Sequence, residues 1–150
     1  MNKFKLLLLA FISSLFISAC SSAPKEDKQE LHICPQCNME LPSSNLHTST
    51  IEKDGEAYYF DDPGCMILWA QKNEISCKSV QAKIFANDSK KYINVLEAFY
   101  TINEKTPMLY GFSAYENEQN STIDFAEVKI RMLRGEHMAN PKIRKHILGY

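Results

Sequence analysis

The chain has 150 residues, with 17 Lys and Arg against 18 Asp and Glu, and 45% of its residues are hydrophobic. This length and composition suit one small domain with a buried core and exclude a disordered chain. The formal net charge of -1 argues against a nucleic-acid partner, because dedicated nucleic-acid binders carry a clear basic excess. The sequence contains no Gly-rich phosphate-binding motif, which argues against the common kinds of nucleotide chemistry.

The N-terminus has the features of a bacterial lipoprotein signal. Lys3 and Lys5 precede an apolar run that has the length of a signal peptide and is too short to span a membrane. Small residues then lead to Cys20, which would become the acylated first residue of the mature chain. We therefore expect residues 1–19 to be a lipoprotein signal peptide, with an ordinary secretory signal cleaved near Ala19 as the alternative.

A polar stretch follows the expected lipidation site. Residues 20–30 show no apolar periodicity, so we expect a flexible tether. Multiple acyl chains would anchor the following domain, residues 31–150, stably to a membrane and facing the periplasm. Ser21, rather than Asp, after the lipidated cysteine favours the outer membrane of a Gram-negative cell, with the inner membrane as the alternative.

Residues 31–150 predict a single α+β domain. Asp54-Gly55 is a hairpin turn signal, Asp62 is a helix cap with Pro63 at the first helical position, and Gly135 is a helix C-cap. In chain order we expect strands at 47–52 and 56–60, a helix at 63–73, strands at 80–86, 92–100 and 108–115, and helices at 123–134 and 141–148. The order strand, strand, helix, strand recurs in part later in the chain, which indicates two related halves near 31–88 and 91–150.

Sulfur-containing residues gather at the start of this domain, where Cys34, Cys37 and Met39 lie within six residues. Three interpretations compete: a dithiol redox motif, half of a zinc site, or a soft-metal site that uses Cys37 and Met39. Zinc is the poorest fit, because no second Cys-x-x-Cys follows and His137 and His146 lack the spacing of a zinc-binding pair.

The redox interpretation fits the two cysteines but not their surroundings. A thioredoxin-like motif opens a helix, whereas Pro42 would interrupt a helix that began at Cys37. A structural disulfide between Cys34 and Cys37 is a further alternative, because the periplasm is oxidising.

Binding of Cu(I) would explain the presence of Met39 two residues after Cys37. Thiolate and thioether are soft ligands that select Cu(I) over harder ions. In an extended segment, residues i and i+2 point to the same face with Cα atoms roughly 6.6 Å apart, so the sulfurs of Cys37 and Met39 could converge on one ion. A single Met beside a Cys is more often a core residue, so the spacing alone does not decide between these possibilities.

Three motifs occur in a characteristic order: Cys34-x-x-Cys37-Asn38-Met39, Phe60-Asp61-Asp62-x-Gly64-Cys65-Met66 and Thr106-Pro107-Met108-x-Tyr110-Gly111-Phe112. Behind a lipoprotein signal, this pattern resembles the NosL family, the copper-binding lipoproteins that accompany nitrous oxide reductase. The resemblance covers residues 34–134 and departs from the family at Asn38, where many members have Gly.

The resemblance implies a periplasm-facing Cu(I) carrier that is not an enzyme and that supplies copper to nitrous oxide reductase or another copper-enzyme client. It also implies an α+β fold of two related β-β-α-β halves. By motif, Cys37 and Met39 match the family's ligands and Met108 matches a third, while a fourth ligand is open. The rival functions are a thiol–disulfide oxidoreductase that uses Cys34 and Cys37, and a structural lipoprotein whose cysteines form disulfides.

Further residues have both a chemical and a structural interpretation. Cys65, in the first turn of the helix capped by Asp62, is expected to have a lowered pKa and could be an auxiliary ligand, as could Cys34. A packed small residue or a disulfide partner is the alternative for Cys65. We expect Asp61 to be solvated, and we assign no role to Cys77.

Overall fold

The computed structural model describes residues 32–149, which contain six strands and three helices. In chain order they are β1 (Ser49–Lys53), β2 (Glu56–Phe60), α2 (Pro63–Lys72), β3 (Gln81–Phe85), β4 (Tyr92–Asn94), β5 (Phe99–Thr101), β6 (Ser113–Tyr115), α3 (Phe125–Arg134) and α4 (Pro141–Leu148). These described residues belong to one compact unit. The expected signal peptide, the lipidation of Cys20 and the tether at 20–30 lie outside the described residues. Within 32–149, no helix is long and apolar enough to cross a membrane.

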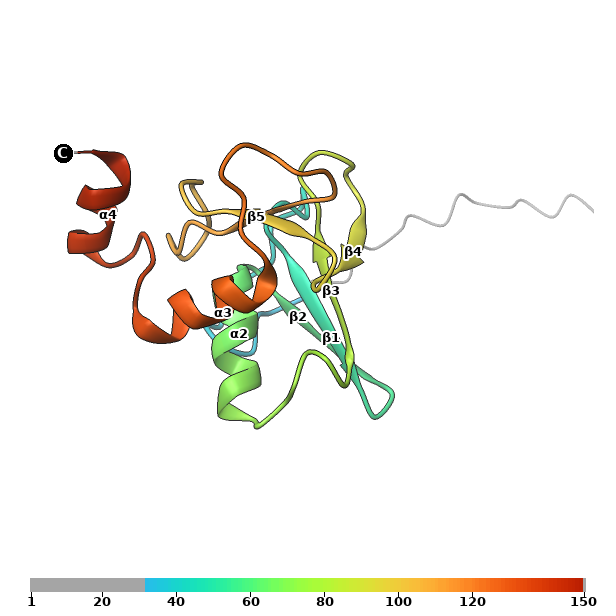
Figure 1. The fold of residues 1–150 in the computed structure, drawn as a ribbon. Helices are drawn as coiled ribbons and strands as arrows, with labels where there is room; N and C mark the ends of the chain where they lie inside the picture. Colours follow the sequence, from blue (N-terminus) through green and yellow to red (C-terminus); the bar gives the residue numbers. More distant parts are fainter. Residues whose placement is uncertain (1–31, 150) are drawn as a thin grey trace, which may run out of the picture. The chain divides into compact units, whose positions relative to one another are not determined.

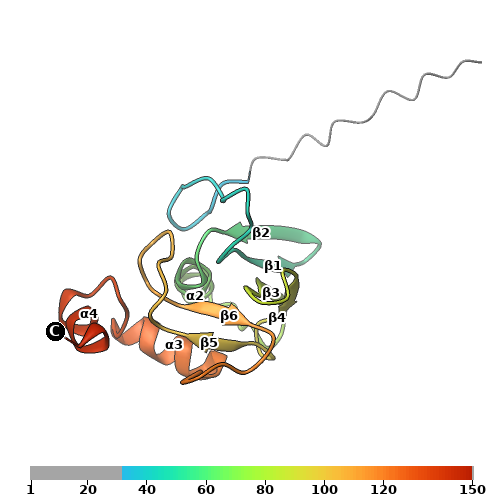
Figure 2. The ribbon, with the colours of Figure 1, turned by 90° about the horizontal axis from the view of Figure 1, so that it is seen from above.

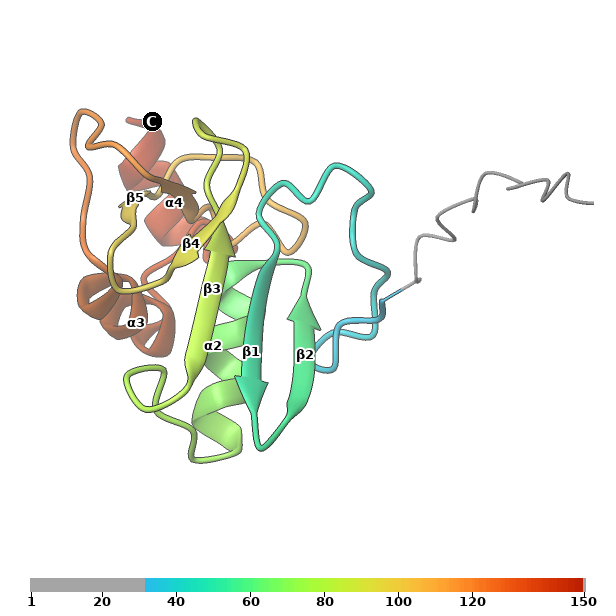
Figure 3. The ribbon, with the colours of Figure 1, turned by 90° about the vertical axis from the view of Figure 1, so that its right-hand side faces the viewer.

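The strands form two antiparallel sheets, which confirms the α+β class. The larger sheet has the strand order β2-β1-β3-β4, with β1 paired to β2 and to β3 (Figure 3). The smaller sheet pairs β5 with β6, which lie beside α3 when the domain is viewed from above (Figure 2). A parallel bridge between Ala86, just after β3, and Ala114 in β6 connects the two sheets.

Helix α2 lies across one face of the larger sheet, and α3 packs beside it (Figures 1 and 3). The Asp62 side chain caps α2 by accepting a hydrogen bond from the Gly64 amide, and Pro63 occupies the first turn, as the sequence predicts. Helix α3 ends at Gly135 in the left-handed conformation, also as predicted. The core lies between the helices and the sheets, where Met66, Val128 and other apolar side chains are buried.

Two predicted strands are wrong in part. The segment 92–100 divides into β4 and β5, and only the last three residues of 108–115 form a strand, β6. Leu109 has φ 58° and Gly111 has φ 90°, values that an extended strand cannot accommodate. Residues 106–111, which we call the Met108 loop, therefore form an irregular segment that lies against the start of α2.

The β-β-α-β order expected in both halves occurs in the first half and does not recur in the second, which begins with β4. The order β1, β2, α2, β3 matches the β-β-α-β pattern. In the second half, β5, β6 and α3 are followed by α4, which starts at Pro141 behind the capping side chain of Asn140. Helix α4 forms where the sequence predicts it, because a cap and a first-turn proline together initiate a helix, and no strand follows α3 among the described residues.

The turn between β3 and β4 is tied to the turn after β6 by Asp88. Burial opposes its ionisation, but hydrogen bonds from the amides of Glu116 and Asn117 outweigh burial and lower the pKa of Asp88. We expect Asp88→Ala to lower the free energy of unfolding by about 1 kcal/mol at neutral pH. Because the native pKa is depressed, this difference should vanish as the pH falls through that pKa.

Urea denaturation of both proteins at neutral and acid pH would measure the difference. Glu118→Ala is the control, because it removes an exposed acidic side chain from the segment after β6 that Asp88 contacts. It should leave the urea midpoint unchanged. Equal midpoints for Asp88→Ala and the unmodified chain at neutral pH would contradict the stabilising role of Asp88.

Candidate metal centre

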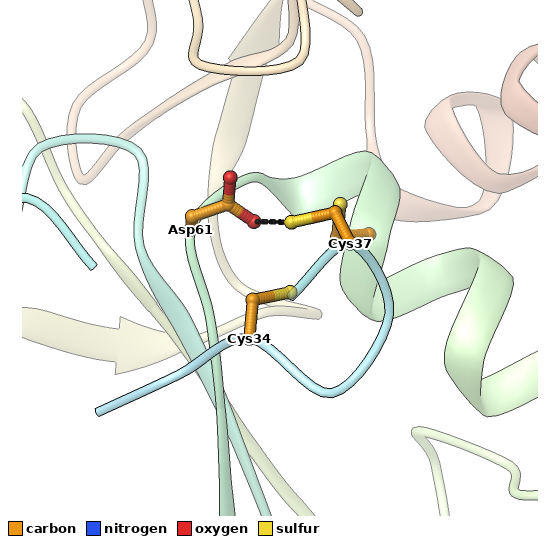
Figure 4. A group of neighbouring side chains, drawn as sticks. Cys34, Cys37 and Asp61 are labelled. Carbon is orange, nitrogen blue, oxygen red and sulfur yellow. Dashed lines mark hydrogen bonds between the residues drawn. The ribbon is translucent and has the colours of Figure 1, made fainter. Parts of the chain in front are cut away.

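Three cysteines and one aspartate converge within the first half of the domain: Cys34, Cys37, Asp61 and Cys65. We call them the thiol cluster. One ligand atom from each of the four residues lies within 4.8 Å of the others. Figure 4 shows Cys34 and Cys37 on their loop, with Cys37 directed at the carboxylate of Asp61. Four donor atoms this close together could hold a metal ion.

The Cys-x-x-Cys segment forms a closed turn. The Cys34 amide donates a hydrogen bond to the Met39 carbonyl at 2.8 Å, and the Asn38 amide donates to the Cys34 carbonyl at 2.9 Å. Asn38 closes the turn with φ 61°, a left-handed conformation that Asn tolerates better than most residues. Cys34 is fully buried as a result, whereas Cys37 is half-buried at the edge of the cluster.

The other two members come from the junction of β2 and α2. Strand β2 ends at Phe60, and α2 begins after its cap, Asp62. Cys65 therefore occupies the third helical position, as predicted, and is fully buried. Asp61 lies between the strand and the cap, so the short connection determines where its side chain points.

The prediction that Asp61 is solvated is wrong. Its side chain is completely buried, and the Cys37 thiol donates a hydrogen bond to Oδ1 at 3.2 Å (Figure 4). Among the described residues, none donates a hydrogen bond to its other oxygen, Oδ2. A buried carboxylate oxygen without a partner is energetically unfavourable, and a cation bound beside the three thiols would satisfy it.

The three thiols differ in their tendency to ionise. A hydrogen bond from the Cys65 thiol is the main cause that lowers the pKa of Cys34 to about 6. The same interaction, followed by burial, raises the pKa of Cys65. The pKa of Cys65 was expected to be lowered by the helix dipole, and that prediction is wrong because the neighbouring thiolate disfavours a second charge. Burial raises the pKa of Cys37 to about 12.

The two methionines predicted as ligands differ in their placement. Met39 is 44% exposed, and the extended Cys37–Met39 segment that was expected to bring the two sulfurs together is absent, because Asn38 has a positive φ. Met108 is half-buried and packs against the core that contains Cys34 and Cys65. The role of both methionines as metal ligands stays a prediction.

Tyr110 borders the thiol cluster. Its ring lies against Gly64, where an added Cβ would fall 2.2 Å from Cδ2 of Tyr110. Burial is the main cause that raises the pKa of Tyr110 to about 12. Phe112, by contrast, is fully buried in the core. Tyr110 therefore packs on the first turn of α2, which carries Cys65.

His32 and Cys77 lie outside the thiol cluster. His32 stacks on Tyr59 with ring centroids 3.8 Å apart. Cys77 lies in an apolar depression that is also lined by Phe125 and Ile130. Cys34, Cys37, Cys65 and Cys77 are all free thiols in this structure, so it contains none of the disulfides considered from the sequence.

The sequence argument against zinc depended on the lack of a second ligand pair. The fold supplies Cys65 and Asp61 to complete four donors, the usual number in a structural zinc site, so that argument no longer holds. Asp61 was missed because strand alternation places it opposite the buried Phe60, on the expected solvent side. The aspartate pair before a Pro-Gly-Cys helix start was the only local signal.

Comparisons with known protein families, with curated proteins and with solved structures found no match to this chain. The metal-binding capacity of the cluster therefore depends on the geometry of the four donors. That geometry does not specify which metal is bound.

The ionisation of Cys34 provides a test of the cluster. Because the Cys65 thiol stabilises the Cys34 thiolate, we expect Cys65→Ala to raise the pKa of Cys34 from about 6 toward its ordinary value. Ultraviolet absorbance of the thiolate during a pH titration of metal-free, reduced protein would follow this change.

Cys77→Ala is the matched control, because Cys77 lies in the separate apolar depression. It should leave unchanged the absorbance step at low pH that reports the ionisation of Cys34. A low-pH step that persists unchanged in Cys65→Ala would refute the proposed stabilisation.

Proposed function

We propose that this protein is a lipid-anchored, periplasm-facing Cu(I)-binding accessory protein that delivers copper for the maturation of nitrous oxide reductase or a related copper-enzyme client. The observation that carries the proposal is the convergence of Cys34, Cys37 and Cys65 around the buried Asp61 carboxylate. The three motifs that resemble the NosL family contribute these residues and the nearby Met108. No catalytic step is needed for this role.

The donor set supports copper in its reduced state. Three thiols with two methionines close by in the sequence or the fold form a soft environment, and softness favours Cu(I). The buried thiols of Cys34 and Cys65 would hold the ion away from water. The half-buried Cys37 and the exposed Met39 lie toward the surface, where a ligand of the client could replace them one at a time.

Zinc is the second candidate because the cluster includes a carboxylate oxygen. Three thiolates and one carboxylate would satisfy a tetrahedral Zn²⁺. A closed four-ligand site would hold Zn²⁺ as a structural ion, whereas a carrier needs an accessible ligand. The exposure at Cys37 and Met39 therefore favours a carrier of Cu(I).

The oxidoreductase alternative has one observation in its favour, the lowered pKa of Cys34. Thiol–disulfide exchange, however, requires the attacking sulfur to reach the disulfide of the substrate. Cys34 is 0% exposed, and the more accessible Cys37 has a pKa raised to about 12 by burial. This distribution of exposure and acidity opposes redox catalysis and is compatible with metal binding.

A competition titration of the full-length chain in detergent, under anaerobic reducing conditions, tests metal binding. We expect one Cu(I) per chain, competing with a chromophoric Cu(I) chelator. Cys37→Ser should weaken binding by more than about tenfold, because loss of a ligand exceeds the effect of losing a second-sphere partner. Cys77→Ser, which alters a thiol outside the cluster, should bind as tightly as the unmodified chain.

The same titration with Zn²⁺ present separates the two metals. Retention of Cu(I) against excess Zn²⁺ would support the carrier. Displacement of Cu(I) by Zn²⁺, or equal affinity in Cys37→Ser, would contradict it.

Delivery is tested by mixing the Cu(I)-loaded protein with copper-free nitrous oxide reductase and separating the two after incubation. We expect copper to move to the reductase at a rate that depends on the concentration of both proteins, because ligand exchange requires a complex. Transfer no faster than release to a small chelator would exclude this reductase as the client.

A further inference from the structure

The carboxylate of Asp62 connects two parts of the domain that are far apart in the sequence. Oδ1 accepts a hydrogen bond from the Gly64 amide at 2.8 Å, which caps α2. Oδ2 accepts a hydrogen bond from the Met108 amide at 3.1 Å. Asp62 is completely buried, so water does not compete for either oxygen.

The Met108 loop lacks regular backbone pairing and depends on such contacts for its conformation. Thr106 Oγ1 accepts a hydrogen bond from the Gly111 amide at 3.2 Å, which closes the loop. Gly111 has φ 90°, and an added Cβ would fall 2.3 Å from Met138 Cγ. The loop thus has one defined shape, and its attachment to α2 decides where Met108 lies.

The loop is attached to the start of α2 at Met108 itself and at Tyr110, two residues further along the chain. Asp62 binds the amide of Met108, and the Tyr110 ring lies on Gly64. Both contacts are at the first turn of α2, which also carries Cys65 of the thiol cluster.

We propose that Asp62 is a positioning residue that holds Met108 against the first turn of α2, so that its thioether joins the thiol cluster in binding Cu(I). The inference depends on the proposed function, because it assigns a role in the same site. Asp62 itself contacts the Met108 backbone and would not touch the ion.

The chemistry of the side chain explains why a carboxylate suits this position. Ser or Asn can cap a helix with one oxygen, but the amides of Gly64 and Met108 bind the two different oxygens of the Asp62 carboxylate. In Asp62→Asn one oxygen is replaced by an amino group, so either the Gly64 amide or the Met108 amide would face another donor. The helix cap and the loop attachment could then not both be retained.

The test uses Cu(I) titration and methyl-labelled methionine NMR on the full-length chain in detergent. In the unmodified chain, we expect the Met108 methyl signal to shift when Cu(I) binds. In Asp62→Asn, this shift should be lost and Cu(I) affinity should fall by about 10- to 100-fold. Met108→Leu identifies the signal, and the double variant Asp62→Asn, Met108→Leu should bind no more weakly than Met108→Leu alone.

Asp124→Asn is the matched control, because Asp124 caps α3 through the Glu127 amide as Asp62 caps α2. It should leave Cu(I) affinity and the Met108 signal unchanged. If Asp62→Asn does not fold by circular dichroism, Asp62→Ser keeps a capping oxygen, loses the second acceptor and serves in its place.

The outcomes separate this inference from the proposed function. Retention of the Met108 shift in the Asp62 variant, or an affinity loss that adds to that of Met108→Leu, would overturn the positioning role. A Met108 signal that never responds to bound Cu(I) would also overturn it while leaving copper binding intact. Failure of the unmodified chain to bind Cu(I) would refute the function itself.

Discussion

Two adjacent carboxylates are buried at the junction of β2 and α2, and the arrangement of the candidate site depends on them. Asp61 meets the Cys37 thiol, and Asp62 meets the amides of Gly64 and Met108. Burial is the main cause that raises the pKa of Asp62 to about 6, in spite of these hydrogen bonds. Burying charge without a cationic partner destabilises a small domain. A bound cation that interacts only with the folded state would offset that cost.

The three thiols of the cluster differ in how deeply they are buried. Cys34 and Cys65 are completely buried, and Cys37 lies at the edge. A metal ion held by all three would be protected from water and would have one ligand within reach of a partner. This gradient connects the packing of the domain to its proposed role, because a carrier must bind its ion tightly and still release it. A closed structural site would need no accessible ligand.

The thiol cluster lies in the first half of the chain, and a loop of the second half packs beside it. The first half supplies the Cys-x-x-Cys turn and the β2–α2 junction, and the second supplies the Met108 loop. The expected strand at 108–115 is shortened to β6, and the residues before it turn away to cover the start of α2. Packing of α3 beside α2 keeps the second half close to the junction. Residues 106–111 thus leave the strand and pack against the first turn of α2, beside the thiol cluster.

Local signals in the sequence determined the elements that begin or end at a cap, a turn or a proline. The hairpin at Asp54-Gly55, the start of α2 at Asp62 and the end of α3 at Gly135 all depend on residues within a few positions of one another. Only the tertiary structure decided that Asp61 is buried and that Met108 lies beside Asp62. Those outcomes depend on hydrogen bonds between residues 24 and 46 positions apart. No local pattern encodes such contacts, because they form only when the sheet, the helix and the two loops pack together.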